Sequence, residues 1–349
     1  MDRPTDRRAV LLACREEQLD SLLALRRIAA HLADLTRLGP TDTEWPGSRR
    51  PGGRRPGAAL VCDDEATTAQ LVRLGVPVLH LSSYPFAPSL PVTPVSSVPS
   101  ISSFTQPGPT GGVLPRAHWA GWLDHPPGLR ATGLLAPTRL TRNRDRRGAL
   151  LLLSLWGVPA QEAESFTTDR LPALIREAAR RTGGCTVICD TSLDLVRAAA
   201  VGVPDTAVVR AADTNVDARH AESELLLASP TMAALALARA RLAPLAFLPP
   251  LGPAQHALAE RLTRIVPVPT LGLTGPPDPA HPADPDAAAT AAAEPPPTAT
   301  GAPPRAADRA VWVPPSPEVQ WAGLGPELDD LRGAQTVART VRRLLLTPL

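Results

Sequence analysis

Two short apolar runs, each followed by a turn and a helix start, lie within residues 222–256 and constrain the fold more than any other feature. Residues 225–227 are three consecutive leucines, which is typical of a strand covered on both faces. The Ser-Pro-Thr turn at 229–231 can cap an alanine- and leucine-rich helix expected over 231–241. The run at 245–248 repeats the pattern before a second helix. The stretch predicts neighbouring strands of an open α/β sheet, each with a helix N-terminus beyond its carboxyl end.

The same alternation of strand and helix extends through most of the chain. Further strands are expected at residues 9–14, 58–62, 75–81, 149–155, 186–190, 207–210 and 265–269. Further helices are expected at residues 20–35, 67–74, 168–181 and 193–200. Such βαβ units predict an α/β fold of two doubly wound Rossmann-like domains that face a cleft.

Composition sets the domain boundaries. Residues 1–130 are predicted to form a shortened N-terminal domain, and residues 131–274 a C-terminal domain. The Ala/Pro-rich segment 275–307 cannot bury a core, so we interpret it as a linker. The remaining tail, 308–349, contains an amphipathic helix at 331–346 that should dock onto a folded surface.

Two further segments lack periodicity. Residues 39–57 are rich in Gly, Pro and Arg, and we interpret them as a solvated loop. The Pro/Ser-rich segment 84–115 is long enough to be a flap over a site or a disordered stretch.

The composition also limits the chemistry. The chain contains no lysine, so it can form no lysine Schiff base and has no P-loop lysine. The net charge of +2 and the scattered arginines argue against nucleic acid as a partner. The four cysteines match neither a zinc pattern nor a redox pair, which favours a reduced, cytoplasmic compartment. No signal sequence or membrane span is expected, because every apolar run is too short.

Two open α/β domains followed by a docking helix resemble the GT-B glycosyltransferases. In that fold a hydroxyl-rich strand-to-helix turn holds the donor diphosphate, and a Pro-rich turn with Gln binds the donor sugar or phosphate. Ser229-Pro230-Thr231 is similar to the first, and the segment 249–255 to the second. Within the fold, the chain most resembles cytosylglucuronic acid synthase and its relatives in actinobacterial nucleoside-antibiotic pathways. The resemblance, strongest over residues 130–270, implies transfer of glucuronic acid from UDP-glucuronate to N1 of cytosine.

This resemblance and the predicted helix starts suggest a donor site on the C-terminal domain. The nucleotide-sugar-binding residues proposed from the sequence are Ser154, Gly157, Arg210, Ser229, Thr231, Gln255 and His256. Hydroxyls and free N–H groups at a helix start can offset phosphate charge without a metal, so no metal and no cofactor besides the UDP-sugar is expected. Each residue also has a structural alternative: Ser229 and Thr231 could simply cap the helix, and Gln255 could face solvent. Arg210, with Asp213, could face the nucleobase or be solvated.

A catalytic base is expected on the N-terminal, acceptor-side domain, at the carboxyl ends of its first strands. The candidates are Asp20, Asp64 and His80. Asp20 could equally cap its own helix, and His80 lies within an apolar run, where a core histidine is the alternative. No single base is preferred.

Three functions remain open. The leading hypothesis is a metal-independent glycosyltransferase that moves a sugar from a UDP-sugar to a small acceptor, such as a nucleobase or another natural-product intermediate. The second is a catalytically degenerate GT-B-like protein that binds a nucleotide sugar or a protein partner, because the loop at 15–20 lacks the Gly-rich, His-containing sequence usual after the first strand. The third is a hydrolase or epimerase acting on a UDP-sugar. The sequence identifies neither the acceptor nor the oligomeric state.

Overall fold

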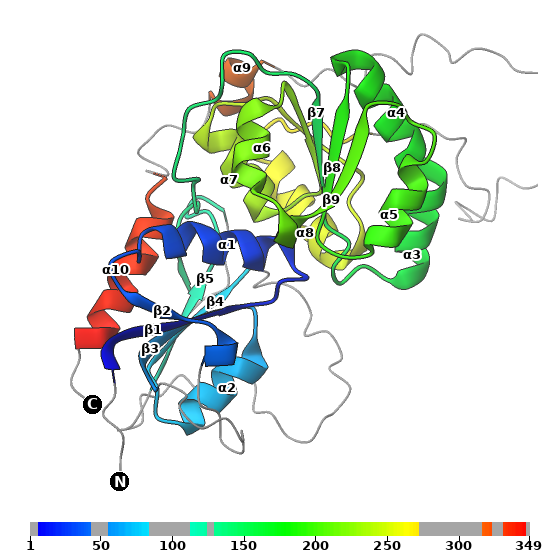
Figure 1. Cartoon of the computed structure of the whole chain (residues 1–349). Coiled ribbons are helices and arrows are strands. Elements are labelled where there is room, and N and C mark those ends of the chain that lie inside the picture. The colour runs from blue at the N-terminus through cyan, green and yellow to red at the C-terminus, as the bar shows by residue number, and fades with distance from the viewer. Residues whose placement is uncertain are drawn as a thin grey trace, which may run out of the picture.

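The computed structural model describes residues 6–42, 55–83, 112–123, 129–271, 316–322 and 331–346, and shows two α/β domains. Each domain is built on one sheet whose named strands all pair in parallel (Figure 1). The prediction of two doubly wound Rossmann-like domains is therefore confirmed. The linker predicted at 275–307 lies outside the described residues, as does most of the Pro/Ser-rich segment (84–111).

The N-terminal sheet has the strand order β2-β1-β3-β4-β5-β6. Its strands are β1 (Asp6–Cys14), β2 (Thr36–Leu38), β3 (Pro56–Cys62), β4 (Val78–Ser82), β5 (Val113–Ala117) and β6 (Arg130–Ala131). Alternate side chains face opposite helices, as the period of a strand requires. Val10, Leu60 and Leu79 pack under helices α1 (Leu19–Ala30) and α10 (Gly333–Leu346). The other face packs under α2 (Glu65–Arg73), and the turn η1 (Pro40–Asp42) follows β2.

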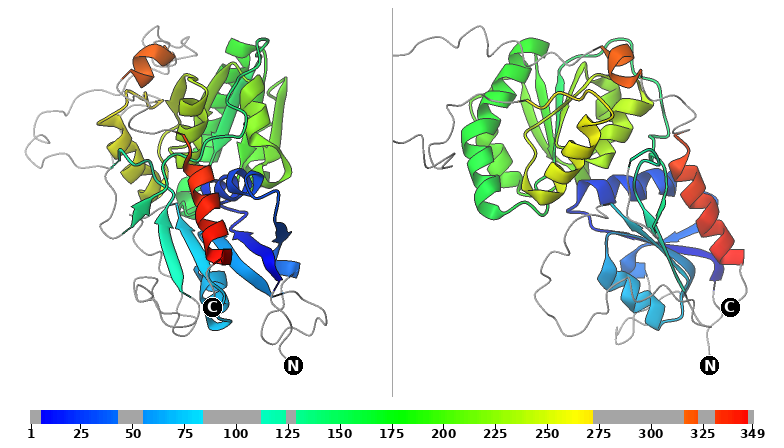
Figure 2. Two further views of the ribbon diagram at one scale, coloured as in Figure 1. Left: turned by 90° about the vertical axis from the view of Figure 1, so that its left-hand side faces the viewer. Right: turned by 180° about the vertical axis from the view of Figure 1, so that it is seen from behind.

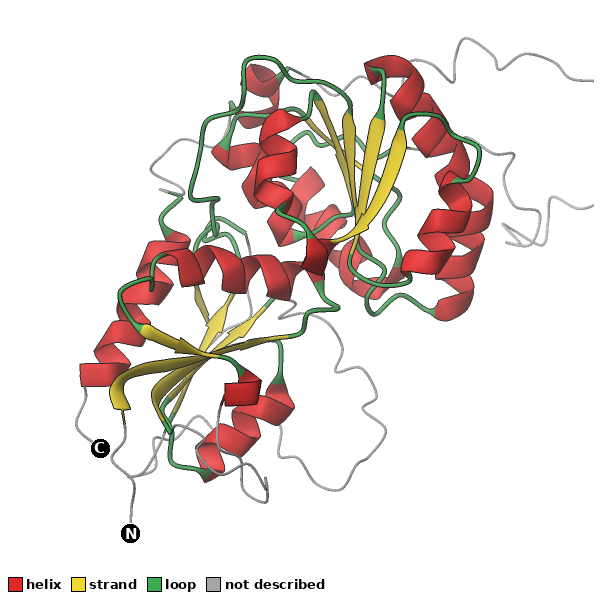
Figure 3. Ribbon diagram, viewed as in Figure 1, coloured by secondary structure: helices red, strands yellow, loops and turns green. Residues whose placement is uncertain are grey.

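The C-terminal sheet has the strand order β11-β10-β7-β8-β9. Its strands are β7 (Ala149–Leu153), β8 (Cys185–Cys189), β9 (Thr206–Arg210), β10 (Leu225–Ala228) and β11 (Leu245–Phe247). One face is covered by α3 (Ala160–Ser165), a π-helical turn (Phe166–Arg170), α4 (Leu171–Thr182) and α5 (Leu193–Ala200). The other is covered by α6 (Val216–Glu222), α7 (Met232–Ala240) and α8 (Gly252–Thr263). Figure 3 shows both sheets between their helices.

Several predicted elements need correction. The first helix ends at Ala30 rather than Leu35, because the chain turns there to form β2. Helical structure before α4 begins at Ala160, eight residues earlier than predicted. The predicted strand 265–269 is absent from the sheet, and only Thr270 bridges to β11, at Phe247. Helix α6 was not predicted.

The two helices described after residue 315 pack on different domains. Helix α9 (Pro317–Trp321) covers the edge strand β11, where Gln320 both accepts from Leu245 N (2.9 Å) and donates to Leu245 O (2.8 Å). Helix α10 packs on the N-terminal sheet beside α1 (Figure 2), as expected for its amphipathic pattern. Its first residue, Gly333, touches the connection between the domains so closely that a Cβ atom would lie 2.6 Å from Leu134 O.

Candidate functional site

The polar residues of the C-terminal domain converge at the carboxyl edge of its sheet, where open α/β sheets bind ligands. Ser154 follows β7 and Ser229 follows β10, and Ser154 N donates to Ser229 Oγ at 3.0 Å. Asp190 follows the neighbouring strand β8 and accepts from Ser154 Oγ at 2.6 Å. The proposed residues Ser154 and Ser229 are therefore adjacent, as a shared site would require.

Asp190 is the central acceptor of this edge and was not proposed from the sequence. Its carboxylate accepts from Leu155 N (2.9 Å) and Thr191 N (2.8 Å) as well as from Ser154. Burial raises the pKa of Asp190, while these hydrogen bonds lower it. Its position directly after a buried strand was the only sequence signal that could have revealed it.

Two helix N-termini face the same edge, as predicted. Thr231 caps α7 through a hydrogen bond from Ala234 N to Oγ1 (3.2 Å). Gln255, in the first turns of α8, is buried rather than solvent-facing: it donates to Ser154 O (2.8 Å) and accepts from Leu251 N (3.1 Å). Both side chains have structural partners within their own domain.

The N-terminus of α7 is occupied by a carboxylate from the other domain. Asp20, fully buried on α1, accepts from Met232 N (3.1 Å) and Ala233 N (2.7 Å). Asp20 therefore does not cap its own helix, whose N-cap is Gln18 and lacks a side-chain cap. Since a helix N-terminus favours negative charge, this carboxylate fills the position predicted from the sequence for the donor phosphate.

Other contacts of the same region close the joint between the domains. Leu19 N approaches Asp190 Oδ2 at 3.4 Å, and the Arg15 guanidinium lies 5.7 Å from the Trp156 ring centroid. Arg26 of α1 donates to three carbonyl oxygens of residues 211–214, beside β9. The start of α1 therefore covers the predicted donor edge.

The remaining predicted donor residues are more exposed. His256 is exposed on α8, and Arg210 is half-buried at the end of β9, next to the turn that carries the exposed Asp213. Gly157 has a φ of 72° and its carbonyl lies against Gly252, so a tight turn there brings the loop after β7 to the start of α8.

A second polar cluster lies at the carboxyl edge of the N-terminal sheet. Asp63, Ser83 and His118 follow the neighbouring strands β3, β4 and β5. Ser83 donates from N (2.6 Å) and Oγ (2.8 Å) to the Asp63 carboxylate, and its Oγ lies 3.3 Å from His118 Nδ1. Burial raises the pKa of Asp63 to about 7, and burial together with Arg27 lowers the pKa of His118 to about 3.

Two of the base candidates from the sequence point away from this cluster. Asp64 caps α2 by accepting from Thr67 N (3.0 Å) and Thr67 Oγ1 (2.6 Å). His80 is buried, and its Nδ1 lies 2.8 Å from Thr68 Oγ1 of α2. These partners give both residues a structural role on the α2 side of the sheet.

Within the described ranges, no group of three His, Cys, Asp or Glu side chains is placed to hold a metal ion. No helix among those residues is long and apolar enough to span a membrane.

A family model described as "CGA synthase-related protein" matches residues 10–299 and 291–349. No curated protein matches the chain. Among solved structures, the glycosyltransferase of kitacinnamycin is 13% identical with a TM-score of 0.49, and the match covers 97% of this chain and 98% of that one. The spinosyn forosaminyltransferase SpnP is 13% identical with a TM-score of 0.43, and the match covers 97% of this chain and 94% of that one. The glycosyltransferase SnogD from Streptomyces nogalater is also 13% identical, with a TM-score of 0.36, and the match covers 73% of this chain and 84% of that one.

Proposed function

Because the chain belongs to the CGA synthase-related family, we propose that it is a glycosyltransferase that moves a sugar from a UDP-sugar to a small acceptor. One observation carries this assignment: Ser154, Ser229 and the N-termini of α7 and α8 meet at one sheet edge. Backbone N–H groups and hydroxyls there can bind a diphosphate and stabilise it as it leaves, without a metal.

Donor binding on this scheme requires α1 to move. Asp20 occupies the N-terminus of α7, and a diphosphate cannot share those N–H groups with a carboxylate. We infer that the donor displaces Asp20 as the joint between the domains opens.

The acceptor would lie against the carboxyl edge of the N-terminal sheet. Ser83 Oγ has one hydrogen, and when that hydrogen is donated to Asp63 the oxygen can only accept from His118 Nδ1–H. His118 Nε2 then carries a lone pair and has no partner among the described residues. Once opening exposes it, this nitrogen could accept the proton that a nucleobase N–H or a hydroxyl loses on transfer.

The finer proposal follows the resemblance to cytosylglucuronic acid synthase: the sugar is glucuronic acid and the acceptor a nucleobase. Purified protein, treated with EDTA to remove metals, would be incubated with UDP-glucuronate or UDP-glucose and with cytosine or uracil. We expect UDP release that depends on the acceptor. UDP binding without turnover on any acceptor would refute the transfer reaction, and release without an acceptor would indicate hydrolysis.

A second candidate function is a non-catalytic nucleotide-sugar-binding or accessory protein. It is favoured by the internal partners of the donor-edge residues, since Asp20 fills one helix N-terminus and Gln255 is bonded to Ser154 and Leu251. His118→Gln separates the two functions. A glycosyltransferase that uses His118 should lose kcat with little change in UDP affinity, whereas an accessory protein has no turnover to lose.

A further inference from the structure

The loop that leads into β7 is strongly basic. Residues 139–147 contain five arginines and one aspartate, which gives this segment a net charge of +4 in a chain whose total is +2. Four of the arginines are exposed, namely Arg139, Arg144, Arg146 and Arg147. None of the four is paired with a carboxylate among the described residues. Their mutual repulsion is not balanced within that part of the chain, so the loop attracts anions.

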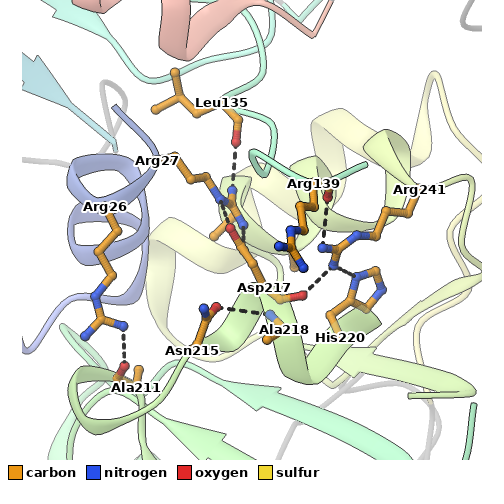
Figure 4. Close-up of polar contacts among 12 residues, drawn as sticks. Arg26, Arg27, Leu135, Arg139, Ala211, Asn215, Asp217, Ala218, His220 and Arg241 are labelled. Carbon is orange, nitrogen blue, oxygen red and sulfur yellow. Dashed lines mark hydrogen bonds and ion pairs between the residues drawn. The ribbon is translucent and has the colours of Figure 1, made fainter. Parts of the chain in front are cut away.

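The ends of two helices hold this basic loop in place. Arg147 N donates to Glu222 O at 3.0 Å, at the last residue of α6. Arg241, which follows α7, donates through Nη2 to Arg139 O at 3.0 Å (Figure 4). Because the loop is bonded at both ends, its arginines are presented in fixed positions, which lowers the entropy cost of binding a partner.

The basic loop lies at the amino edge of the C-terminal sheet, far from the N-terminal domain. Helix α6 shows the direction: near its start Asp217 pairs with Arg27 of α1 at 2.8 Å (Figure 4), and at its end Glu222 meets the loop. The amino ends of the C-terminal strands lie at the top of Figure 1, and the N-terminal domain lies at the bottom. The basic loop is therefore opposite the joint and the proposed donor edge.

Exposed apolar side chains gather at the same edge. Among the described residues seven large apolar side chains are exposed, and five of them lie here. Three of the five follow helices that run back from the carboxyl edge, one lies in the basic loop, and one lies on α9, which covers β11. They are Leu140 (47% exposed), Val201 (80%), Leu242 (56%), Ile265 (43%) and Val319 (62%). Single exposed apolar residues are ordinary, but five beside a basic loop indicate an interaction surface.

We propose that this amino edge binds the surface of a membrane that contains anionic lipids. The arginines would pair with lipid phosphates, for which a guanidinium is well suited, and the apolar side chains would reach below the head groups. All five apolar residues are aliphatic and stand on separate loops and helix ends, whereas a protein interface has a closely packed, aromatic-rich core from which charges are depleted. Nucleic acid would use the arginines and leave the apolar residues exposed.

Binding in this orientation would place the C-terminal domain on the membrane and direct the N-terminal domain into water. Asp20 and Arg27, which close the joint, lie at the other end of the C-terminal domain and would stay free to separate from it. The proposal does not depend on the proposed reaction, because no residue of the donor edge belongs to the basic loop.

The experiment measures co-sedimentation of the full-length protein with vesicles of phosphatidylcholine alone, or of phosphatidylcholine and phosphatidylglycerol in equal parts. We expect binding to the anionic vesicles only, and weaker binding as KCl is added. The triple variant Arg144→Gln, Arg146→Gln and Arg147→Gln should weaken the partition coefficient by about a hundredfold, because each arginine near an anionic surface contributes about fivefold.

Two further variants separate a specific surface from net charge. The matched control removes three exposed arginines that lie away from this edge, and it should change the partition coefficient by less than about threefold. These are Arg37→Gln, Arg73→Gln and Arg170→Gln. The double variant Leu140→Gln and Val319→Gln leaves the charge unchanged and should weaken binding by about tenfold, because two aliphatic side chains no longer leave water. All these positions are exposed, and thermal melts confirm that each variant is folded.

Three results would overturn the proposal. Equal binding to the two kinds of vesicle, or binding to neither, would exclude recognition of anionic lipid. Equal weakening by the two triple variants would mean that the vesicles sense only the net charge of the protein. Unchanged binding of the Leu140→Gln and Val319→Gln variant would mean that no side chain enters the bilayer, and the basic loop would then fit an acidic protein surface instead.

Discussion

The position of Asp20 leads to a prediction that runs against the usual effect of altering a binding site. We expect Asp20→Ala to bind UDP more tightly than the wild-type protein. Its carboxylate accepts two hydrogen bonds at the N-terminus of α7, from Met232 N and Ala233 N. A diphosphate must break both before it can bind there.

The size of the effect follows from those bonds. A hydrogen bond to a charged group contributes about 1.5–3 kcal/mol net, and desolvation of the buried carboxylate offsets part of the second bond. We take the net cost of displacing the carboxylate to be that of one such bond. Removal of the carboxylate should therefore lower the Kd for UDP by about ten- to a hundredfold. The variant should also be less stable without ligand, because two N–H groups lose their acceptor, at a cost of about 2 kcal/mol.

Calorimetric titration with UDP and a thermal melt without ligand test both effects. Glu17→Ala is the matched control, because it removes the same charge from an exposed position three residues away. We expect its Kd to stay within about threefold of the wild-type value. If Asp20→Ala binds UDP no more tightly than Glu17→Ala, the α7 N-terminus is not the phosphate site. Unchanged affinity combined with lost turnover would instead support Asp20 as the catalytic base.

Three other changes test the fold and its electrostatics. The pKa of Asp63 is raised from 3.8 to about 7, so the folded state binds a proton more tightly than the unfolded state. As the pH falls from about 8 to about 5, the free energy of unfolding of the wild-type protein should therefore rise by about 3 kcal/mol relative to that of Asp63→Asn, as measured by urea unfolding. Parallel pH profiles would contradict this. Gly333→Ala should lower the thermal midpoint at a cost of about 1–3 kcal/mol, whereas Gly121→Ala, where nothing lies within 4 Å, should not. A double-mutant cycle of Arg27→Met and Asp217→Asn should give a coupling free energy of about 2 kcal/mol in protein stability. A value near zero would show that this ion pair does not hold the two domains together.

The fold could be predicted because its signals are local. Each buried strand is a short apolar run, and some helices begin at a capping residue such as Thr231 or Asp64. The predicted strand at 265–269 failed because an apolar run shows burial but not pairing, and Val266 and Val268 are buried beside α8 without joining the sheet. Helix α6 was missed because it is short and polar.

The site could be predicted only in part. Proximity of Ser154, Ser229 and Gln255 followed from the sheet topology, since parallel strands end at a common edge. The hydrogen-bond partners at this edge could not be predicted in this way. Asp20 accepts from Met232 of α7, which lies 212 residues later in the sequence, and no local pattern specifies such a contact. His118 was overlooked because β5, the strand before it, contains a proline and reads as part of a loop.

The position of α10 has a consequence for how the chain matures as it is made. N-terminal domains ordinarily fold first, as they leave the ribosome. Here one face of the N-terminal sheet is covered by α10, whose Val337 and Val341 are buried against strands formed by residues 6–82. Until residue 346 has been synthesised, α1 alone covers that face and the part under α10 stays open to solvent, while residues 148–271 already carry both helical layers of their own sheet. The domain that is translated first is therefore the one completed last, and its exposed apolar face is what a chaperone would meet in the interval.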